Sequence, residues 1–160
     1  MPRIFLSFVH EDQAVAEAVQ GVIKAFLDVD AFLSTDQSQV FAGDIWLEKI
    51  RQSLEDAEIV ILMLSARSVR RAWVNFEAGA AWLTKKQIIP CCYGSMSKER
   101  LPHPYSAIQA LNLSDQTFDY LLESICHHIG IDFSERMFRM QGVAFDRLVD
   151  ALSHFVDEGA

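Results

Sequence analysis

The residues with the clearest chemical potential are Trp73 and Glu77, which lie four positions apart after the apolar run 59–64. In a helix this spacing places the indole and the carboxylate one turn apart on the same face. Phe76 and Leu83 would continue that face as an apolar stripe, so we expect the carboxylate at the margin of the core. A carboxylate there costs free energy unless something binds it. Glu77 is therefore the first candidate for a functional residue.

Composition limits the kinds of protein in which this carboxylate can act. The chain has 160 residues, of which 51% are hydrophobic, as expected for one globular domain with a substantial core. The formal net charge of −8 argues against a nucleic-acid partner, because binding the phosphate backbone favours a basic surface. No apolar run approaches the roughly 20 residues of a membrane span, and no signal-peptide region follows Met1. We therefore expect a cytoplasmic protein without a membrane partner.

Hydrophobic patterning predicts the elements that position Glu77. Strands are expected over residues 4–9, 29–33, 59–64, 87–93 and 107–113. Helices are expected over residues 12–26, 44–54, 65–84 and 116–129. Strands that alternate with helices predict the α/β class, with five parallel strands and helices on both faces in three layers.

Residues 131–160 form a separate unit in this prediction, after a domain that spans residues 1–130. Apolar residues recur there at steps of three and four, which predicts an amphipathic helix with a candidate interruption at Gly142. Such a helix either packs on its own domain or forms a surface for assembly with other copies or partners.

Ligands of open parallel sheets bind at the carboxyl ends of the strands. Ser7 to His10, the loop 35–43, Ser65 and the start of the third helix should all meet at that edge. The sequence therefore predicts one crevice that Trp73 and Glu77 also face.

The motifs in this order resemble the Toll/interleukin receptor (TIR) domain family. Residues 4–8 resemble its first box, residues 36–46 its BB loop and following helix, and residues 62–65 its third-strand motif. Trp73-x-x-x-Glu77 resembles the signature of NAD-cleaving TIR domains from bacteria, plants and animal axons. The resemblance covers residues 1 to about 130 and implies a flavodoxin-like fold.

The resemblance also implies a role for particular residues. Glu77 takes the place of the catalytic glutamate, with NAD⁺ as substrate and no metal. The candidate contacts of NAD⁺ are Ser7, Phe8, Asp36, Gly43, Ile45, Ser65 and Trp73. Phe8 or Trp73 would give an aromatic wall for nicotinamide or adenine. Many family enzymes carry basic residues after the first-strand aromatic, whereas this chain has Val9-His10-Glu11.

One carboxylate suffices for this chemistry. Nicotinamide leaves as a neutral molecule, so no general acid is needed, unlike the case of an ordinary glycoside. Glu77 would stabilise the positive charge that develops on the ribose ring. Water as the acceptor gives ADP-ribose, an internal atom gives a cyclic isomer, and a foreign base gives an exchange product. The sequence leaves these outcomes open.

The resemblance implies two classes of function. The first is an NAD⁺ glycohydrolase or ADP-ribosyl cyclase of bacterial immunity, which self-associates and signals to a separate effector. The alternative is a non-catalytic TIR interaction module that works through the BB loop and the C-terminal helix. The glutamate favours the enzyme, because adaptor TIR domains generally lack it. Trp46 and Trp82 are interpreted as packing residues.

Overall fold

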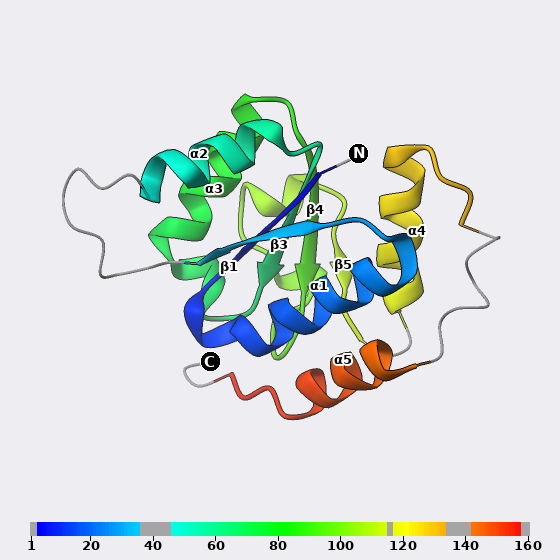
Figure 1. Ribbon diagram of the computed structural model, residues 1–160. Coiled ribbons are helices and arrows are strands. Elements are labelled where there is room, and N and C mark those ends of the chain that lie inside the picture. Colours follow the sequence, from blue (N-terminus) through cyan, green and yellow to red (C-terminus); the bar gives the residue numbers. More distant parts are fainter. Residues whose placement is uncertain (1–2, 36–45, 115–116, 134–141, 158–160) are drawn as a thin grey trace.

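The fold is described from a computed structural model, which covers residues 3–35, 46–114, 117–133 and 142–157. Its centre is a parallel sheet of five strands in the order β2-β1-β3-β4-β5 (Figure 1). The strands are β1 (Ile4–Phe8), β2 (Ala31–Thr35), β3 (Ile59–Leu64), β4 (Gln87–Cys92) and β5 (Leu111–Asn112). The predicted α/β class and the parallel five-stranded sheet are confirmed.

Helices cover both faces of this sheet (Figure 1). They are α1 (Gln13–Leu27), α2 (Trp46–Asp56), α3 (Ala72–Leu83), α4 (Phe118–Ile129) and α5 (Val143–Ser153). Short 3₁₀ turns are η1 (His10–Asp12), η2 (Ser68–Arg70), η3 (Lys98–Arg100) and η4 (Tyr105–Ala107). The last two occupy the proline-containing connection between β4 and β5. β5 is shorter than predicted.

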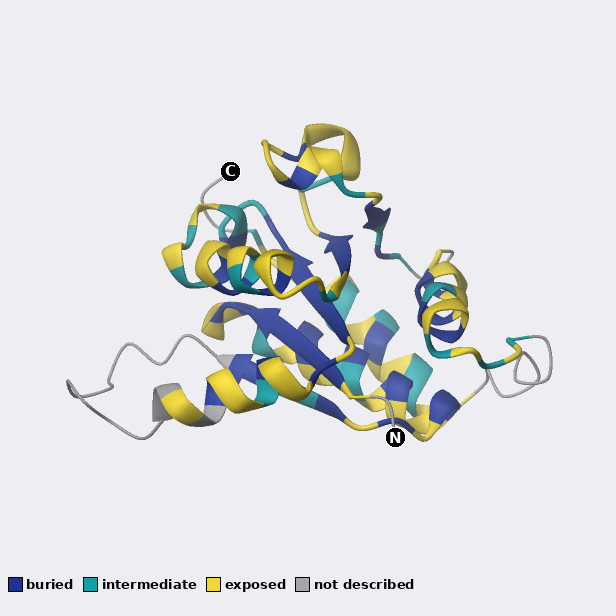
Figure 2. Ribbon diagram, turned by 90° about the horizontal axis from the view of Figure 1, so that it is seen from above, coloured by how far each residue is buried: buried dark blue, intermediate teal, exposed yellow. Residues whose placement is uncertain are grey.

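The strands are buried on both faces, which explains their continuous apolar sequences (Figure 2). In β3 the side chains alternate between two clusters. Ile61 and Met63 pack with α1, α4 and α5, whereas Leu62 and Leu64 pack with α2 and α3. This alternation decides which polar residues at the strand ends can meet.

The C-terminal helix α5 lies against α1 (Figure 1). Leu148 is fully buried in the cluster on that face, and Phe145 and Leu152 pack against the same cluster. Gly142 directly precedes α5, so the helix begins where the pattern indicated an interruption. The domain boundary at residue 130 stays a prediction.

The predicted helix 65–84 is divided. Arg71 is extended, with φ −83° and ψ 126°, and it separates η2 from α3. Arg71 Nη2 also lies 2.6 Å from Glu11 Oε1 and so connects the start of α3 to η1.

The buried face of α3 differs from the expected one. Phe76, Trp82 and Leu83 are 60%, 69% and 75% exposed, so the stripe through Phe76 and Leu83 and the packing role of Trp82 are wrong. Val74, Glu77 and Ala81 face the protein interior instead. In this orientation the Glu77 carboxylate reaches hydrogen-bond donors at the sheet. Among the helices of the described residues, none is long and apolar enough to cross a bilayer.

Candidate functional site

Glu77 is fully buried and bound to two strands. The Ser7 hydroxyl donates a hydrogen bond to its Oε2, and the Ser34 hydroxyl donates one to its Oε1. Hydroxyl donors stabilise a carboxylate in its ionised form and fix its direction. The buried acid that the sequence singled out therefore has its partners at the edge of the sheet.

The sheet register brings the two serines together. Ser7 of β1 is paired with Ser34 of β2, and both lie near the carboxyl ends of their strands. The preceding aromatic residues on the same face, Phe5 and Phe32, stack with ring centroids 5.6 Å apart. Glu77 thus joins α3 to the carboxyl edge of two neighbouring strands, where ligands of parallel sheets bind.

Ser34 was missed in the sequence because it was assigned to the loop that follows the second strand. The sequence nevertheless contains a signal that could have identified Ser34. The tripeptide Phe-Leu-Ser occurs at residues 5–7 and again at residues 32–34, and the structure pairs the two copies residue for residue.

Ser65 lies on the other face of the sheet, so the expected single crevice is wrong for this residue. It follows Leu64, which faces α3, and successive side chains of a strand point to opposite faces. The Ser65 hydroxyl donates to Asp12 Oδ2 at 2.7 Å, and the Tyr93 hydroxyl donates to the same oxygen. The carboxyl edge therefore carries two polar clusters, one on each face.

The second cluster contains a buried charge. Burial raises the pKa of Asp12, although hydrogen bonds from Tyr93 and Ser65 and the charge of Arg67 act to lower it. Arg67 Nε lies 3.1 Å from Asp12 Oδ1, an ion pair whose geometry falls outside that of a hydrogen bond. Burial and the Asp12 carboxylate raise the pKa of Tyr93 well above its ordinary value.

The other residues predicted to contact NAD⁺ are not all found beside Glu77. Phe8 is fully buried in the cluster with α1 and does not line the Glu77 side of the sheet. Trp73 is half-buried, and its ring stacks on Phe76 with centroids 5.8 Å apart. Asp36, Gly43 and Ile45 lie outside the described residues.

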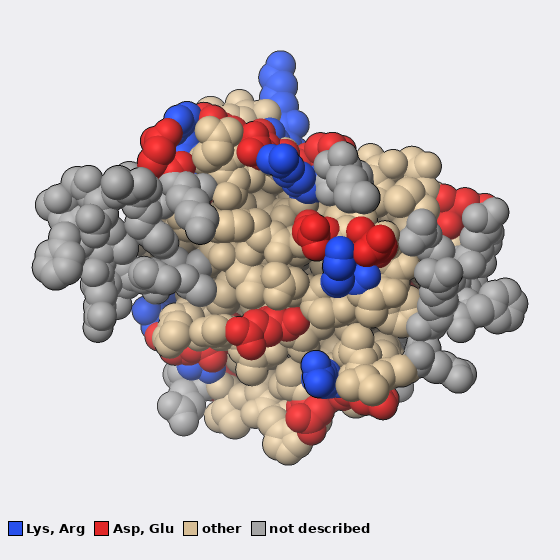
Figure 3. All heavy atoms as spheres, viewed as in Figure 1, with Lys and Arg blue, Asp and Glu red and all other residues tan. Residues whose placement is uncertain are grey.

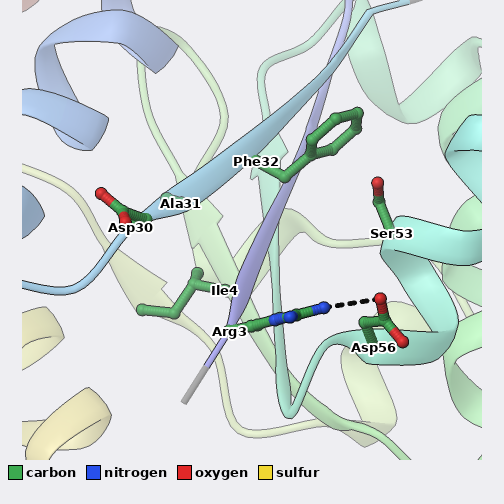
Figure 4. A pocket seen from close by; sticks show the side chains of 7 residues that line it. All are labelled: Arg3, Ile4, Asp30, Ala31, Phe32, Ser53 and Asp56. Carbon is green, nitrogen blue, oxygen red and sulfur yellow. Dashed lines mark hydrogen bonds and ion pairs between the residues drawn. The ribbon is translucent and has the colours of Figure 1, made fainter. Parts of the chain in front are cut away.

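A hollow of about 490 Å³ lies between β2 and α2 (Figure 4). Arg3, Phe32 and Ser53 are among its lining residues, and Arg3 Nη1 pairs with Asp56 Oδ2 at 2.6 Å. Ile4 and Ala31, which also line it, begin their strands. The hollow is therefore at the amino edge, opposite the edge that holds Glu77.

Charged side chains give no sign of a large basic surface on the face shown in Figure 3. Described Lys and Arg residues are scattered there among Asp and Glu. Within the described ranges, no three His, Cys, Asp or Glu side chains are grouped so that they could hold a metal ion.

Comparisons with known proteins agree with the fold and show the family. The family model described as "TIR domain" matches residues 4–126. Similar solved structures include the TIR domain of the Toll-related receptor TRR-2 from Hydra magnipapillata, with a TM-score of 0.61 and 13% identity. That match covers 79% of this chain and 97% of the receptor domain. No curated protein matches the sequence.

Proposed function

Because the chain belongs to the TIR domain family, we propose that it is an NAD⁺ nucleosidase with Glu77 as its catalytic carboxylate. The observation that carries this proposal is the position of Glu77 at the carboxyl edge of the sheet, held by hydroxyls of two adjacent strands. A fixed anion at a ligand-binding edge suits a reaction in which positive charge develops on a sugar.

The ribose of NAD⁺ can offer Glu77 hydroxyl donors like those that the protein itself supplies in this structure. Ser7 and Ser34 each present one hydroxyl to Glu77, and the ribose next to nicotinamide carries two neighbouring hydroxyls. Since Glu77 is fully buried in this conformation, we propose that α3 moves and that the ribose hydroxyls replace the serine hydroxyls. The carboxylate then lies beside the forming ribosyl cation and stabilises it electrostatically.

The capture of that cation determines the product. Attack by water gives ADP-ribose, and attack by an atom of the same molecule gives a cyclic ADP-ribose isomer. We propose a cytoplasmic enzyme of bacterial anti-phage immunity whose nucleotide product acts on a separate effector. Trp73 remains a candidate wall for a flat ring, because it is half-buried one turn before Glu77.

Incubation with NAD⁺ and chromatography of the products test the role of Glu77. We expect the wild type to release nicotinamide and Glu77→Gln to lose at least about 100-fold in rate, because the amide keeps the shape but not the charge. Glu123→Gln on the exposed face of α4 is the matched control and should retain full activity. Equal turnover by Glu77→Gln and the wild type would exclude Glu77 as the catalytic group.

Self-association is the second part of the proposal. If neighbouring copies complete one another's sites, the rate per enzyme molecule should rise with protein concentration. Initial rates measured over a roughly 100-fold range of protein concentration test this expectation, because such a range can take the protein from monomer to assembly. Strict proportionality between rate and enzyme concentration would contradict it.

A non-catalytic interaction module is the second candidate function. The observation that favours it is the exposure of Phe76, Trp82 and Leu83 on α3, since large exposed apolar groups mark interaction surfaces. The similar structure from Hydra magnipapillata belongs to a receptor. Absence of NAD⁺ cleavage at high protein concentration, together with loss of self-association in Trp82→Gln, would favour this candidate.

A further inference from the structure

The segment after α5 closes over the ends of β3 and β4. In Figure 1 the arrowheads of both strands point towards the edge along which this segment, residues 154–157, runs. Asp157 Oδ2 accepts hydrogen bonds from Ser95 Oγ at 2.7 Å, from Ser95 N at 3.1 Å and from Ala66 N at 3.4 Å. Ala66 follows β3 and Ser95 follows β4, so one carboxylate connects two loops.

Packing around Phe155 strengthens this connection. Its ring lies edge-on to Tyr93 with centroids 5.0 Å apart, and the Arg67 guanidinium lies 5.4 Å from its centroid. Arg67 also donates a hydrogen bond to the Val156 carbonyl. A Cβ at Gly94 would lie 2.5 Å from the Phe155 ring, so glycine permits this close approach.

The segment covers the buried polar cluster and lies outside the family match. Arg67, which it contacts, is paired with the buried Asp12. The match to the TIR domain ends at residue 126. The contacts of residues 154–157 are therefore made by a part of the chain that the family model does not match.

These contacts also reach the connection that leads to the candidate catalytic helix. Ala66 and Arg67 belong to residues 65–71, which join β3 to α3. Within this connection the Ser68 hydroxyl donates to the Met63 carbonyl at 3.0 Å, and Arg71 is paired with Glu11. Glu77 lies six positions after Arg71. Any restraint on residues 65–71 therefore acts on the start of the helix that carries Glu77.

We infer that residues 154–157 form an intramolecular latch that restrains residues 65–71 and thereby keeps α3 in the position where Glu77 is buried. Asp157 and Phe155 are its two contact residues. Release of the latch frees the connection, allows α3 to move and exposes Glu77. The latch itself is independent of the reaction, whereas its effect on turnover rests on the proposed function.

Hydrogen–deuterium exchange of the full-length protein tests the latch. In Asp157→Asn the amides of residues 65–71 and of the first turns of α3 should exchange about tenfold faster, because a charged acceptor is lost. The rise over residues 65–71 should exceed that of the β1 and β3 amides, which follow only the global loss of stability. Glu123→Gln removes the same charge from exposed α4 and should leave all of these rates unchanged. Wild-type exchange over residues 65–77 in Asp157→Asn, or an equal rise throughout the sheet, would overturn the inference.

A second variant separates the ring contacts from the charge. Phe155→Leu keeps an apolar side chain but loses the contacts with Tyr93 and Arg67, so it should accelerate exchange in the same residues by about threefold. Faster exchange limited to residues 93–96 and 154–157 would show that the contacts of the latch act only locally, and it would overturn the link to α3.

NAD⁺ cleavage gives the regulatory readout. Asp157→Asn should turn over faster than the wild type by at least about threefold, in line with its greater exchange. Accelerated exchange together with absent cleavage in both proteins refutes the proposed function and leaves the latch established. Cleavage that is equal in both proteins, despite accelerated exchange, refutes the regulatory effect of the latch.

Discussion

Glu77, Ser7 and Ser34 show how a buried acid is accommodated at the end of a parallel sheet. Each carboxylate oxygen accepts a hydrogen bond from a serine hydroxyl, and the two serines come from paired positions on neighbouring strands. Loss of either hydroxyl leaves a buried carboxylate oxygen with one donor fewer. The serines therefore contribute to stability whether Glu77 is catalytic or not.

Ser34→Ala tests this contribution. We expect the free energy of unfolding to fall by about 1–3 kcal/mol, which is the range for removing one partner of a buried polar group. Urea unfolding followed by circular dichroism measures the change. Ser106→Ala, at an exposed position in η4, should stay within about 0.5 kcal/mol of the wild type. Equal stability of Ser34→Ala and the wild type would show that the hydroxyl is dispensable.

At the scale of the element, α3 buries Glu77 between two apolar residues and exposes large apolar side chains. Val74, Glu77 and Ala81 face the interior, whereas Phe76 and Leu83 are exposed. A helix arranged in this way is stabilised by contacts that its hydrophobic pattern does not indicate. Its exposed apolar groups contribute little to the stability of the monomer.

Two substitutions in α3 distinguish its faces. Val74→Ala removes two methyl groups from a fully buried side chain and should lower the free energy of unfolding by about 2 kcal/mol. Trp82→Gln, at a position that is 69% exposed, should change it by less than about 0.5 kcal/mol. Thermal unfolding at low protein concentration measures both variants. A large loss of stability in Trp82→Gln would mean that the indole packs against the protein.

At the scale of the whole molecule, two aspartates have pKa values shifted in opposite directions, and they affect stability differently as the pH changes. Burial opposes the charge of Asp157, but hydrogen bonds from Ser95 and Ala66 and the charge of Arg67 outweigh it and lower the pKa. Burial raises the pKa of Asp12. Ionised Asp157 therefore stabilises the fold above its ordinary pKa, whereas ionised Asp12 costs stability as the pH rises from its ordinary pKa to its raised one.

Asp157→Asn should accordingly show a pH-dependent loss of stability. At pH 7 we expect a loss of about 1–2 kcal/mol in the free energy of unfolding, because hydrogen bonds to a charged acceptor disappear. The difference from the wild type should shrink as the pH falls below the ordinary pKa of aspartate, near 3.8, and vanish below the lowered folded value. Urea unfolding at several pH values measures this trend. A loss of the same size at every pH would assign the effect to shape instead of charge.

The sequence by itself determined the order of strands and helices and singled out Glu77 as an acid near the core. The apolar run 59–64 and the alternation of strands and helices predicted β3 at its observed bounds and the parallel sheet. These features depend on hydrophobic periodicity over neighbouring residues, which a sequence displays directly. The sequence drew attention to Glu77, although it did so through an apolar stripe with Phe76 and Leu83 that the structure exposes.

Only the tertiary structure decided which polar residues meet. Ser7 and Ser34 are 70 and 43 positions from Glu77, and the strand register, not local pattern, brings them to its two oxygens. Ser65 lies at the same edge but on the opposite face, with Asp12, because strand side chains alternate. In its observed orientation α3 makes these distant hydrogen bonds and exposes Phe76 and Leu83, which the local apolar pattern could not predict because it carries no information on residues far away in the sequence.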